Sequence, residues 1–268
     1  MNPVSRSELR AQLVESRIAG RVATPRENNL ANYRHMSDRD PHYLFGLTPQ
    51  GEWTPTDVLK LMVDRCGVDP DPNHLRGPDT IDPDLTIDRL DALADRLREA
   101  MTRRERVLVA TGHPVGLRPT HSMIAATLKA AGCTLIHAAE GWEHPEHTPY
   151  GPVGHIVYVD DIATTARSNG TLQHTHSPLP MRAVLDELDR AGEPWPDLVV
   201  ADHGWAGAAG AAGIDSVGFA DCNDPALFVA EAEGTVVVCV PLDDNVYPVD
   251  VYDPMNAYLQ ARLDTPAG

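Results

Sequence analysis

Acidic residues directly follow two short apolar runs in this sequence. DLVVAD ends in Asp202, and SVGFAD ends in Asp221, which is followed by Asn223 and Asp224. A carboxylate at the end of a buried strand is costly to desolvate unless it binds a cation, caps a helix or transfers a proton. Carboxylates with an amide nearby form the oxygen-rich environment that Mg²⁺ and Mn²⁺ prefer. We therefore predict a divalent-metal site, with Mg²⁺ or Mn²⁺ favoured, although Asp224 before Pro225 also fits a helix N-cap. The predicted ligands are Asp202, Asp221, Asn223 and Asp224.

Histidines lie beside these acids. His203 follows Asp202, His113 follows the run RVLVATG, and His174 and His176 lie in HTHSP. His174 and His176 are two residues apart on an extended segment, so both imidazoles point to the same face. That pattern suits metal or anion binding, and it also suits a plain polar edge. We predict His113 and His203 to be catalytic, one of them as the general acid.

A third group of residues suits the binding of a phosphate. The run GWAGAAG from residue 204 is predicted to be a turn whose small residues let the backbone approach a ligand, with N–H groups at the start of the next helix. It matches neither the dinucleotide fingerprint nor the P-loop motif. Arg182 offers a fork of donors that suits phosphate oxygens. The residues predicted to bind substrate are Thr111, Gly112, His174, His176, Arg182 and Gly204.

The elements that must position these residues alternate between apolar runs and amphipathic segments. This alternation predicts an α/β fold with a three-layer, mostly parallel, Rossmann-like sheet and helices between its strands. A Ser-Asn-Gly turn at 168–170 predicts a hairpin or a strand bend at the sheet edge. In such sheets ligands bind at the carboxyl ends of the strands, where the polar clusters fall. The predicted strands are 106–112, 133–138, 155–161, 171–176, 197–202, 216–221 and 235–241.

The N-terminal third has a different character. We expect residues 1–105 to form a helical, loop-rich extension packed on an α/β core of residues 106–268, in one integrated domain. We expect residues 21–52 to form a wrap or lid with short helices, and residues 68–85 to form no regular secondary structure. Helices are expected from Thr54 to a stop at Gly67 and from Thr86 onward.

Composition excludes several partners. The 268 residues carry 22 Lys plus Arg against 39 Asp plus Glu, a net charge of -17. Such a surplus repels nucleic acid and anionic membranes, so we expect neither as a partner. The start has no apolar signal region, no run spans a membrane, and the four cysteines form no secreted-type spacing. These features predict a cytoplasmic protein with reduced thiols.

Several motifs resemble a known family. VATPRENNL, RRERVLVATGHPVGL, HTHSP, DLVVADHGWAGAAG and VGFADCNDPALFVAEAEG resemble an actinobacterial phosphatase family, over about residues 20 to 262. The resemblance implies an α/β phosphatase. GFADCNDPAL is also similar to the last motif of haloacid-dehalogenase-type phosphatases, which implies Asp221 and Asp224 as Mg²⁺ ligands. Those enzymes need an Asp-x-Asp-x-Thr nucleophile loop, which this sequence lacks, so an aspartyl-phosphate mechanism is excluded.

Together these features predict a phosphoric monoester hydrolase in which a divalent metal activates water against a small phosphorylated substrate. Two alternatives stay open. One is a metal-dependent lyase, isomerase or cyclase acting on a phosphorylated or carboxylated metabolite, and the other is a sugar-phosphate or nucleotide binding protein without turnover.

Overall fold

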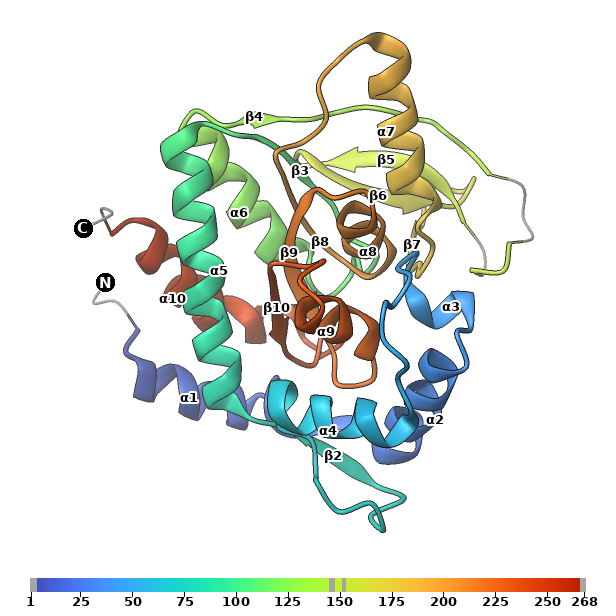
Figure 1. Cartoon of the computed structure of the whole chain (residues 1–268). Helices are drawn as coiled ribbons and strands as arrows, with labels where there is room; N and C mark the ends of the chain where they lie inside the picture. The colour runs from blue at the N-terminus through green and yellow to red at the C-terminus, as the bar shows by residue number, and fades with distance from the viewer. Residues whose placement is uncertain (1–3, 145–147, 151–152, 266–268) are drawn as a thin grey trace.

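A five-stranded sheet forms the centre of the molecule. The computed structural model describes residues 4–144, 148–150 and 153–265. The sheet has the order β10-β9-β8-β3-β4, and every neighbouring pair is parallel (Figure 1). The predicted parallel α/β sheet is therefore confirmed. Its strands are β3 (Arg106–Val109), β4 (Thr134–Leu135), β8 (Leu198–Asp202), β9 (Asp215–Ala220) and β10 (Val238–Pro241).

The strand order reverses at β3. From β3 the chain moves to β4 on one side and then crosses to β8, β9 and β10 on the other. The loops that leave β3 and β8 therefore part in opposite directions and open a crevice at the carboxyl ends. The register places Asp202 beside Phe219 and Ala220 beside Pro241, so β8, β9 and β10 end at the same edge.

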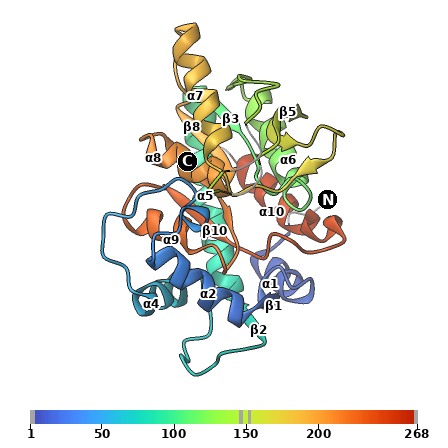
Figure 2. The same ribbon diagram turned by 90° about the vertical axis from the view of Figure 1, so that its right-hand side faces the viewer.

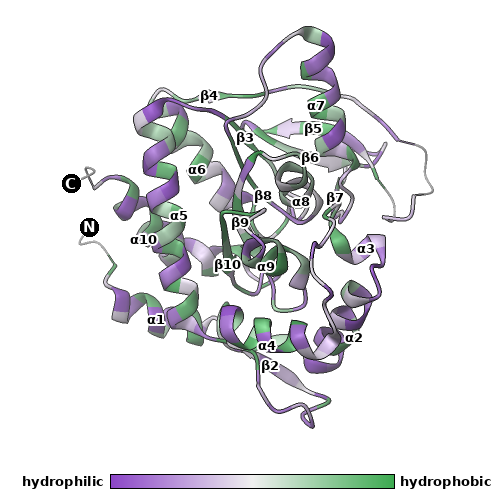
Figure 3. Cartoon of the chain, in the orientation of Figure 1, coloured by the Kyte–Doolittle hydropathy of each residue, from purple (hydrophilic) through white to green (hydrophobic). Residues whose placement is uncertain are grey.

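Helices pack on the sheet in two groups. Helices α5 (Pro83–Arg103), α6 (Arg118–Ala130) and α10 (Asp253–Leu263) contact one another, and α5 packs on β10. Helices α7 (Leu179–Ala191), α8 (His203–Ala211) and α9 (Pro225–Ala232) form the other group, in which α8 packs on β8 and β9. Figure 3 shows the hydrophobic residues gathered on the central strands and on α9, whereas α1 and α5 alternate in character. Among the described residues, no helix combines the length and the apolarity needed to cross a membrane.

The Gly/Ala-rich run after β8 corrects one prediction. It is helix α8, whereas the sequence suggested a turn. Alanine favours helix strongly, and the glycines lie where neighbouring backbone comes close. A Cβ on Gly204 would lie 2.2 Å from the Ser177 carbonyl oxygen, and one on Gly207 would lie 2.3 Å from that of Phe45. These glycines serve close packing and do not mark a loop.

A separate three-stranded antiparallel sheet holds β5 (His155–Val159), β6 (Ile162–Ala166) and β7 (Leu172–Gln173). The 168–170 turn joins β6 to β7, but β6 itself and the tight turn before it were not predicted. In that turn Asp160 and Asp161 have φ of 53° and 66°, which suits the right-handed twist of a hairpin. An isolated parallel bridge between Ala110 and Ala163 ties this sheet to the end of β3.

The N-terminal segment is more regular than predicted. Residues 21–52 hold most of β1 and two helices, and the 68–85 stretch holds β2, which pairs antiparallel with β1. The fully buried ion pair of Arg26 and Asp79, 2.8 Å apart, fixes α2 to β2. The hydrophobic core is continuous from Leu9 to Leu263. The elements are α1 (Arg6–Glu15), β1 (Gly20–Pro25), α2 (Arg26–Ser37), α3 (Pro41–Leu44), α4 (Pro55–Cys66), β2 (Pro78–Ile81) and a 3₁₀ helix η1 (Val249–Tyr252).

Helix boundaries follow the expected chemistry in several places. Thr54 caps α4 with a capping box, and Gly67 ends that helix in the left-handed region. Helix α5 begins at Pro83, three residues before the predicted Thr86, because Asp82 supplies the cap. The cysteines Cys66, Cys133, Cys222 and Cys239 are free and buried.

Candidate functional site

A cavity of about 700 Å³ opens at the carboxyl edge of the parallel sheet. Residues that follow β3, β8, β9 and β10 line one side of the cavity, and residues of the N-terminal segment around β1 and α2 line the other. This is the location that the strand-end clusters predicted. Figure 2 shows the N-terminal segment in the lower half of the molecule, below β10. The lining residues are Ser16, Arg17, Ala23, Thr24, Pro25, Asn28, Asn32, His113, His174, His176, His203, Asp221, Asn223, Asp224, Asp243, Asp244, Asn245, Val246 and Tyr247.

His203 lies at the centre of the site. It joins β8 to α8 with a φ of 48°, a left-handed conformation that non-glycine residues seldom adopt. Its Nδ1 lies 2.8 Å from Oδ1 of Asp202, and its Nε2 lies 3.4 Å from Oδ2 of Asp224. Strained backbone is retained where the surrounding structure over-determines it, and such positions cluster at functional sites. The turn thus aims one imidazole nitrogen into the cavity and fixes the other.

Asp202 holds this arrangement from behind. Its carboxylate accepts hydrogen bonds from the Thr111 hydroxyl at 2.5 Å and from the Gly112 N–H at 2.6 Å, besides its contact with His203. It is fully buried. Both oxygens therefore accept hydrogen bonds within the protein. Asp202 was predicted to be a metal ligand, but in the structure it orients His203.

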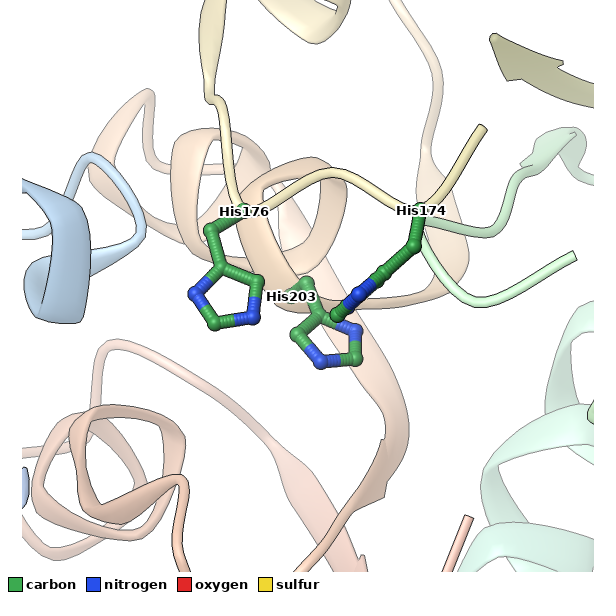
Figure 4. A group of neighbouring side chains, drawn as sticks. All are labelled: His174, His176 and His203. Atoms are coloured by element: carbon green, nitrogen blue, oxygen red, sulfur yellow. The ribbon is translucent and has the colours of Figure 1, made fainter. Parts of the chain in front are cut away.

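Three imidazoles meet beside this turn. The ring centroids of His174, His176 and His203 lie 4.9 to 5.0 Å apart, in a nearly equilateral triangle (Figure 4). One nitrogen of each can be chosen so that all three lie within 4.8 Å of one another. The His174–His176 segment is held by the Thr175 N–H, which donates to the Gly112 carbonyl, and by the close approach of Gly204.

Four carboxylates line the floor. Asp221 accepts from the Thr24 hydroxyl and from the Cys222 N–H, both at 2.6 Å. Asp224 is the N-cap residue of α9, but its side chain makes no capping bond and turns to His203. Capping therefore does not occupy this side chain. The remaining two carboxylates are Asp243 and Asp244, which follow β10.

Oδ2 of Asp244 is buried and has no hydrogen-bond partner among the described residues. It lies 3.8 Å from Nε2 of His203. Leaving a buried carboxylate oxygen unpaired is costly, so such an atom calls for a cation or a proton. Asp244 closes one triple of candidate ligand atoms with His203 and Asp224 and another with Asp221 and Asp243.

The pKa values of the acids reflect this crowding. Burial and the neighbouring Asp243 raise the pKa of Asp221 to about 8. Burial likewise raises the pKa of Asp243 and raises that of Asp244 well above its ordinary value, with Asp221 and Asp224 adding to the rise at Asp244. These carboxylates lack sufficient positive charge nearby, which a bound cation supplies.

The pKa values of the histidines divide into two kinds. Burial opposes a charged ring at His203, but Asp224 and Asp202 outweigh it and raise its pKa well above the ordinary value. Burial and the charge on His203 lower the pKa of His113 to about 4 and that of His174 to about 3. The same two causes lower the pKa of His176 well below its ordinary value. His113, His174 and His176 are therefore neutral at physiological pH, and neutral imidazole is the form that binds metals.

The structure brings most of the predicted residues to the cavity. The histidines His113, His174, His176 and His203 line it, as do Asp221, Asn223 and Asp224. Thr111, Gly112 and Gly204 lie beneath the lining and position it through the contacts described above. Arg182 is exposed on α7 and does not line the cavity.

Other lining residues were missed as site residues. The acids Asp243 and Asp244 fit a turn equally well from the sequence alone. Thr24, Asn28 and Asn32 come from a segment read as a wrap or lid, with no local signal of a site. Arg17 is the one Arg or Lys among the described lining residues, and nothing in the sequence distinguishes it from other surface arginines.

Comparison with known proteins identifies the family of this chain. A protein-family model described as Phosphatase matches residues 4–266. The curated protein Phosphatase SCO2771 of Streptomyces coelicolor is 51% identical over 256 residues, which cover 95% of each chain. With such a match over almost its whole length, the chain belongs to the Phosphatase family.

Proposed function

We propose that this protein hydrolyses a small phosphomonoester with a water molecule activated by a divalent metal. The observation that carries the proposal is the buried, unpartnered Oδ2 of Asp244, which faces His203 in a cavity floored by further carboxylates. A carboxylate in that setting suits a cation, and the cavity is open to a substrate.

The candidate ligand atoms lie close enough together to share a cation. His203, Asp224 and Asp244 offer atoms within 4.8 Å of one another, and so do Asp221, Asp243 and Asp244. A bound divalent cation would lower the pKa of water and offset charge on phosphoryl oxygens. Asp202 supports the ligand role of His203, because a metal-binding imidazole typically donates its second N–H to a carboxylate.

His113 is placed to handle the proton. Its ring lies in the cavity wall, its Nε2 lies 3.9 Å from Asp244 Oδ1, and its buried Nδ1 has no partner among the described residues. As a neutral imidazole it can accept the proton of the attacking water. The same ring can then deliver that proton to the leaving oxygen of the substrate alcohol.

Arg17 and the polar wall of the N-terminal segment hold the rest of the substrate. Asn28 and Asn32 offer amide donors and acceptors, and Tyr247, which is 57% exposed, offers a ring face. The cavity volume of about 700 Å³ exceeds that of a bare phosphate and suits a small polar alcohol attached to it. These features favour a small phosphorylated substrate, and the net charge of -17 disfavours nucleic acid as a partner.

Phosphate release from a generic aryl phosphate tests the proposal. Chelation should abolish turnover, and re-addition of Mg²⁺, Mn²⁺, Zn²⁺ or Co²⁺ should restore it. Asp221→Asn should abolish turnover with the fold intact, whereas Asp186→Asn on the exposed face of α7 should not change it. Full activity after thorough chelation would overturn the metal role. Absence of phosphate release with all four ions would instead favour a lyase, isomerase or cyclase using the same edge of the sheet.

A further inference from the structure

We propose that the cavity binds two cations at sites of different chemistry, one among imidazoles and one among carboxylates; this deepens the proposed function and rests on it. The nitrogen site consists of His174, His176 and His203. The oxygen site consists of Asp221, Asp243 and Asp244.

The candidate ligand atoms form a chain of three overlapping triples. Among the described residues, the nitrogens of His174 and His176 close a triple only with His203, and the oxygens of Asp221 and Asp243 close one only with Asp244. The end triples share no residue. The middle triple of His203, Asp224 and Asp244 links them. One cation cannot serve both ends, because its ligands would have to lie within one coordination sphere.

An unpartnered atom marks the oxygen site independently of the clustering. Asp244, with a side chain only 7% exposed, leaves Oδ2 unpaired at the oxygen site. A buried polar atom without a partner in a native structure indicates a ligand, an ion or a water molecule. At the nitrogen site Figure 4 shows the Nδ1 of His176 on the side of the ring away from His174 and His203, so its Nε2 is the nitrogen that faces them.

Neighbouring ligand atoms link the two sites. Nε2 of His203 lies 3.4 Å from Asp224 Oδ2 and 3.8 Å from Asp244 Oδ2. A carboxylate between two cations can give one oxygen to each. Asp224 and Asp244 are therefore the bridging candidates.

The two sites should differ in the ions they select. Imidazoles suit Zn²⁺, Co²⁺ and other transition metals, whereas an all-oxygen set suits Mg²⁺, Ca²⁺ or Mn²⁺. They also differ in access, because His174 is exposed while Asp221, Asp243 and Asp244 are all buried. An added chelator should therefore reach the nitrogen site first.

Metal content of the purified full-length protein tests this directly. Metal-free protein is loaded with Co²⁺ and Mg²⁺, passed over a desalting column and measured by elemental analysis, with visible absorption reporting Co²⁺ bound to nitrogen. Wild type should hold one Co²⁺ and one Mg²⁺ per chain. His176→Gln should lose the Co²⁺ and its absorption but keep the Mg²⁺, and Asp243→Asn should do the reverse.

Matched controls lie away from the cavity. His35→Gln on α2 and Asp186→Asn on α7 should each keep both ions, and thermal melts in chelator should show that every variant folds. One ion per chain, lost completely in either variant, would overturn the two-site inference and leave metal-assisted hydrolysis standing. No bound ion in the wild type would overturn both.

Discussion

Asp202 and His203, neighbours in the chain, also bond to each other through their side chains, with Oδ1 and Nδ1 2.8 Å apart. Adjacent residues on a straight strand point to opposite faces, so this contact exists because the backbone reverses at His203, where φ is 48°. The sharp turn lets one buried carboxylate hold the neighbouring imidazole in place. His203 can then face the cavity with one defined nitrogen.

Asp202→Asn tests this positioning role. The amide keeps the shape but loses the negative charge and one of the two accepting oxygens, so the charge-assisted hydrogen bond that orients His203 should weaken. We expect activity and metal affinity to fall about 10–100-fold, as for other partners that orient metal-binding imidazoles. Metal affinity by calorimetry, measured beside a thermal melt, separates this role from a purely structural one. Unchanged affinity in a destabilised variant would show that Asp202 serves the fold alone.

Asp224→Asn separates helix capping from chemistry. Asparagine caps helices about as well as aspartate, and the Asp224 side chain makes no capping bond, so α9 should keep its stability. Removing the charge that lies 3.4 Å from His203 should reduce turnover more than about 100-fold, beyond the effect typical of residues outside the ligand shell. Steady-state kinetics and a thermal melt measure the two effects. Wild-type turnover would remove Asp224 from the site.

Arg17→Ala tests how the cavity attracts an anion in an acidic protein. Arg17 lines the cavity, and Arg182 is exposed on α7 outside it, so Arg182→Ala is the matched control. Loss of a charged contact to bound substrate should raise KM about tenfold, equivalent to about 1.4 kcal/mol of binding, with kcat unchanged. The control should keep both constants. Equal effects from the two variants would show a general charge effect and no contact by Arg17.

Tyr158 gives stability a dependence on alkaline pH. Its hydroxyl donates to the Ala138 carbonyl and accepts from the Ala138 N–H, both at 2.9 Å, and burial raises its pKa to about 12. The folded protein favours the neutral phenol, so this contribution is full below the unfolded pKa of about 10 and is lost as pH rises through about 12. The free energy of unfolding of the wild type, measured with urea, should fall over that pH range. Tyr158→Phe should lower the free energy of unfolding by about 1–2 kcal/mol at neutral pH, and its free energy of unfolding should lack this part of the fall at alkaline pH.

The strand ends were predictable because a buried parallel strand is a continuous apolar run in the sequence, and the polar residues that follow it identify its end. Asp221, Asp224 and His203 were found in this way. The same reasoning misplaced Asp202, because only the turn at His203 determines that the carboxylate points backward. The Gly/Ala run of α8 was misread because the need for its glycines arises from Ser177 and Phe45, which local sequence cannot show.

The contribution of N-terminal residues to the cavity could not be predicted from the sequence for a related reason. Thr24 bonds to Asp221 across 197 residues of chain, and a threonine in a polar stretch carries no mark of such a partner. Asp243 and Asp244 were visible as a strand ending but equally fitted a turn. They lie in the site because β10 pairs with β9, and local sequence does not determine that pairing.

Residues from the N-terminal and the C-terminal parts of the chain line the cavity, so the ribosome synthesises them at different times. Asp244 follows Thr24 by 220 residues, so a ribosome makes it much later. A nascent polypeptide can already contain β3, β8 and their histidines while the last acids are still missing. The lining of the cavity is therefore complete only once residues 243–247 have been made, and a translation product that stops before them lacks two of the four carboxylates.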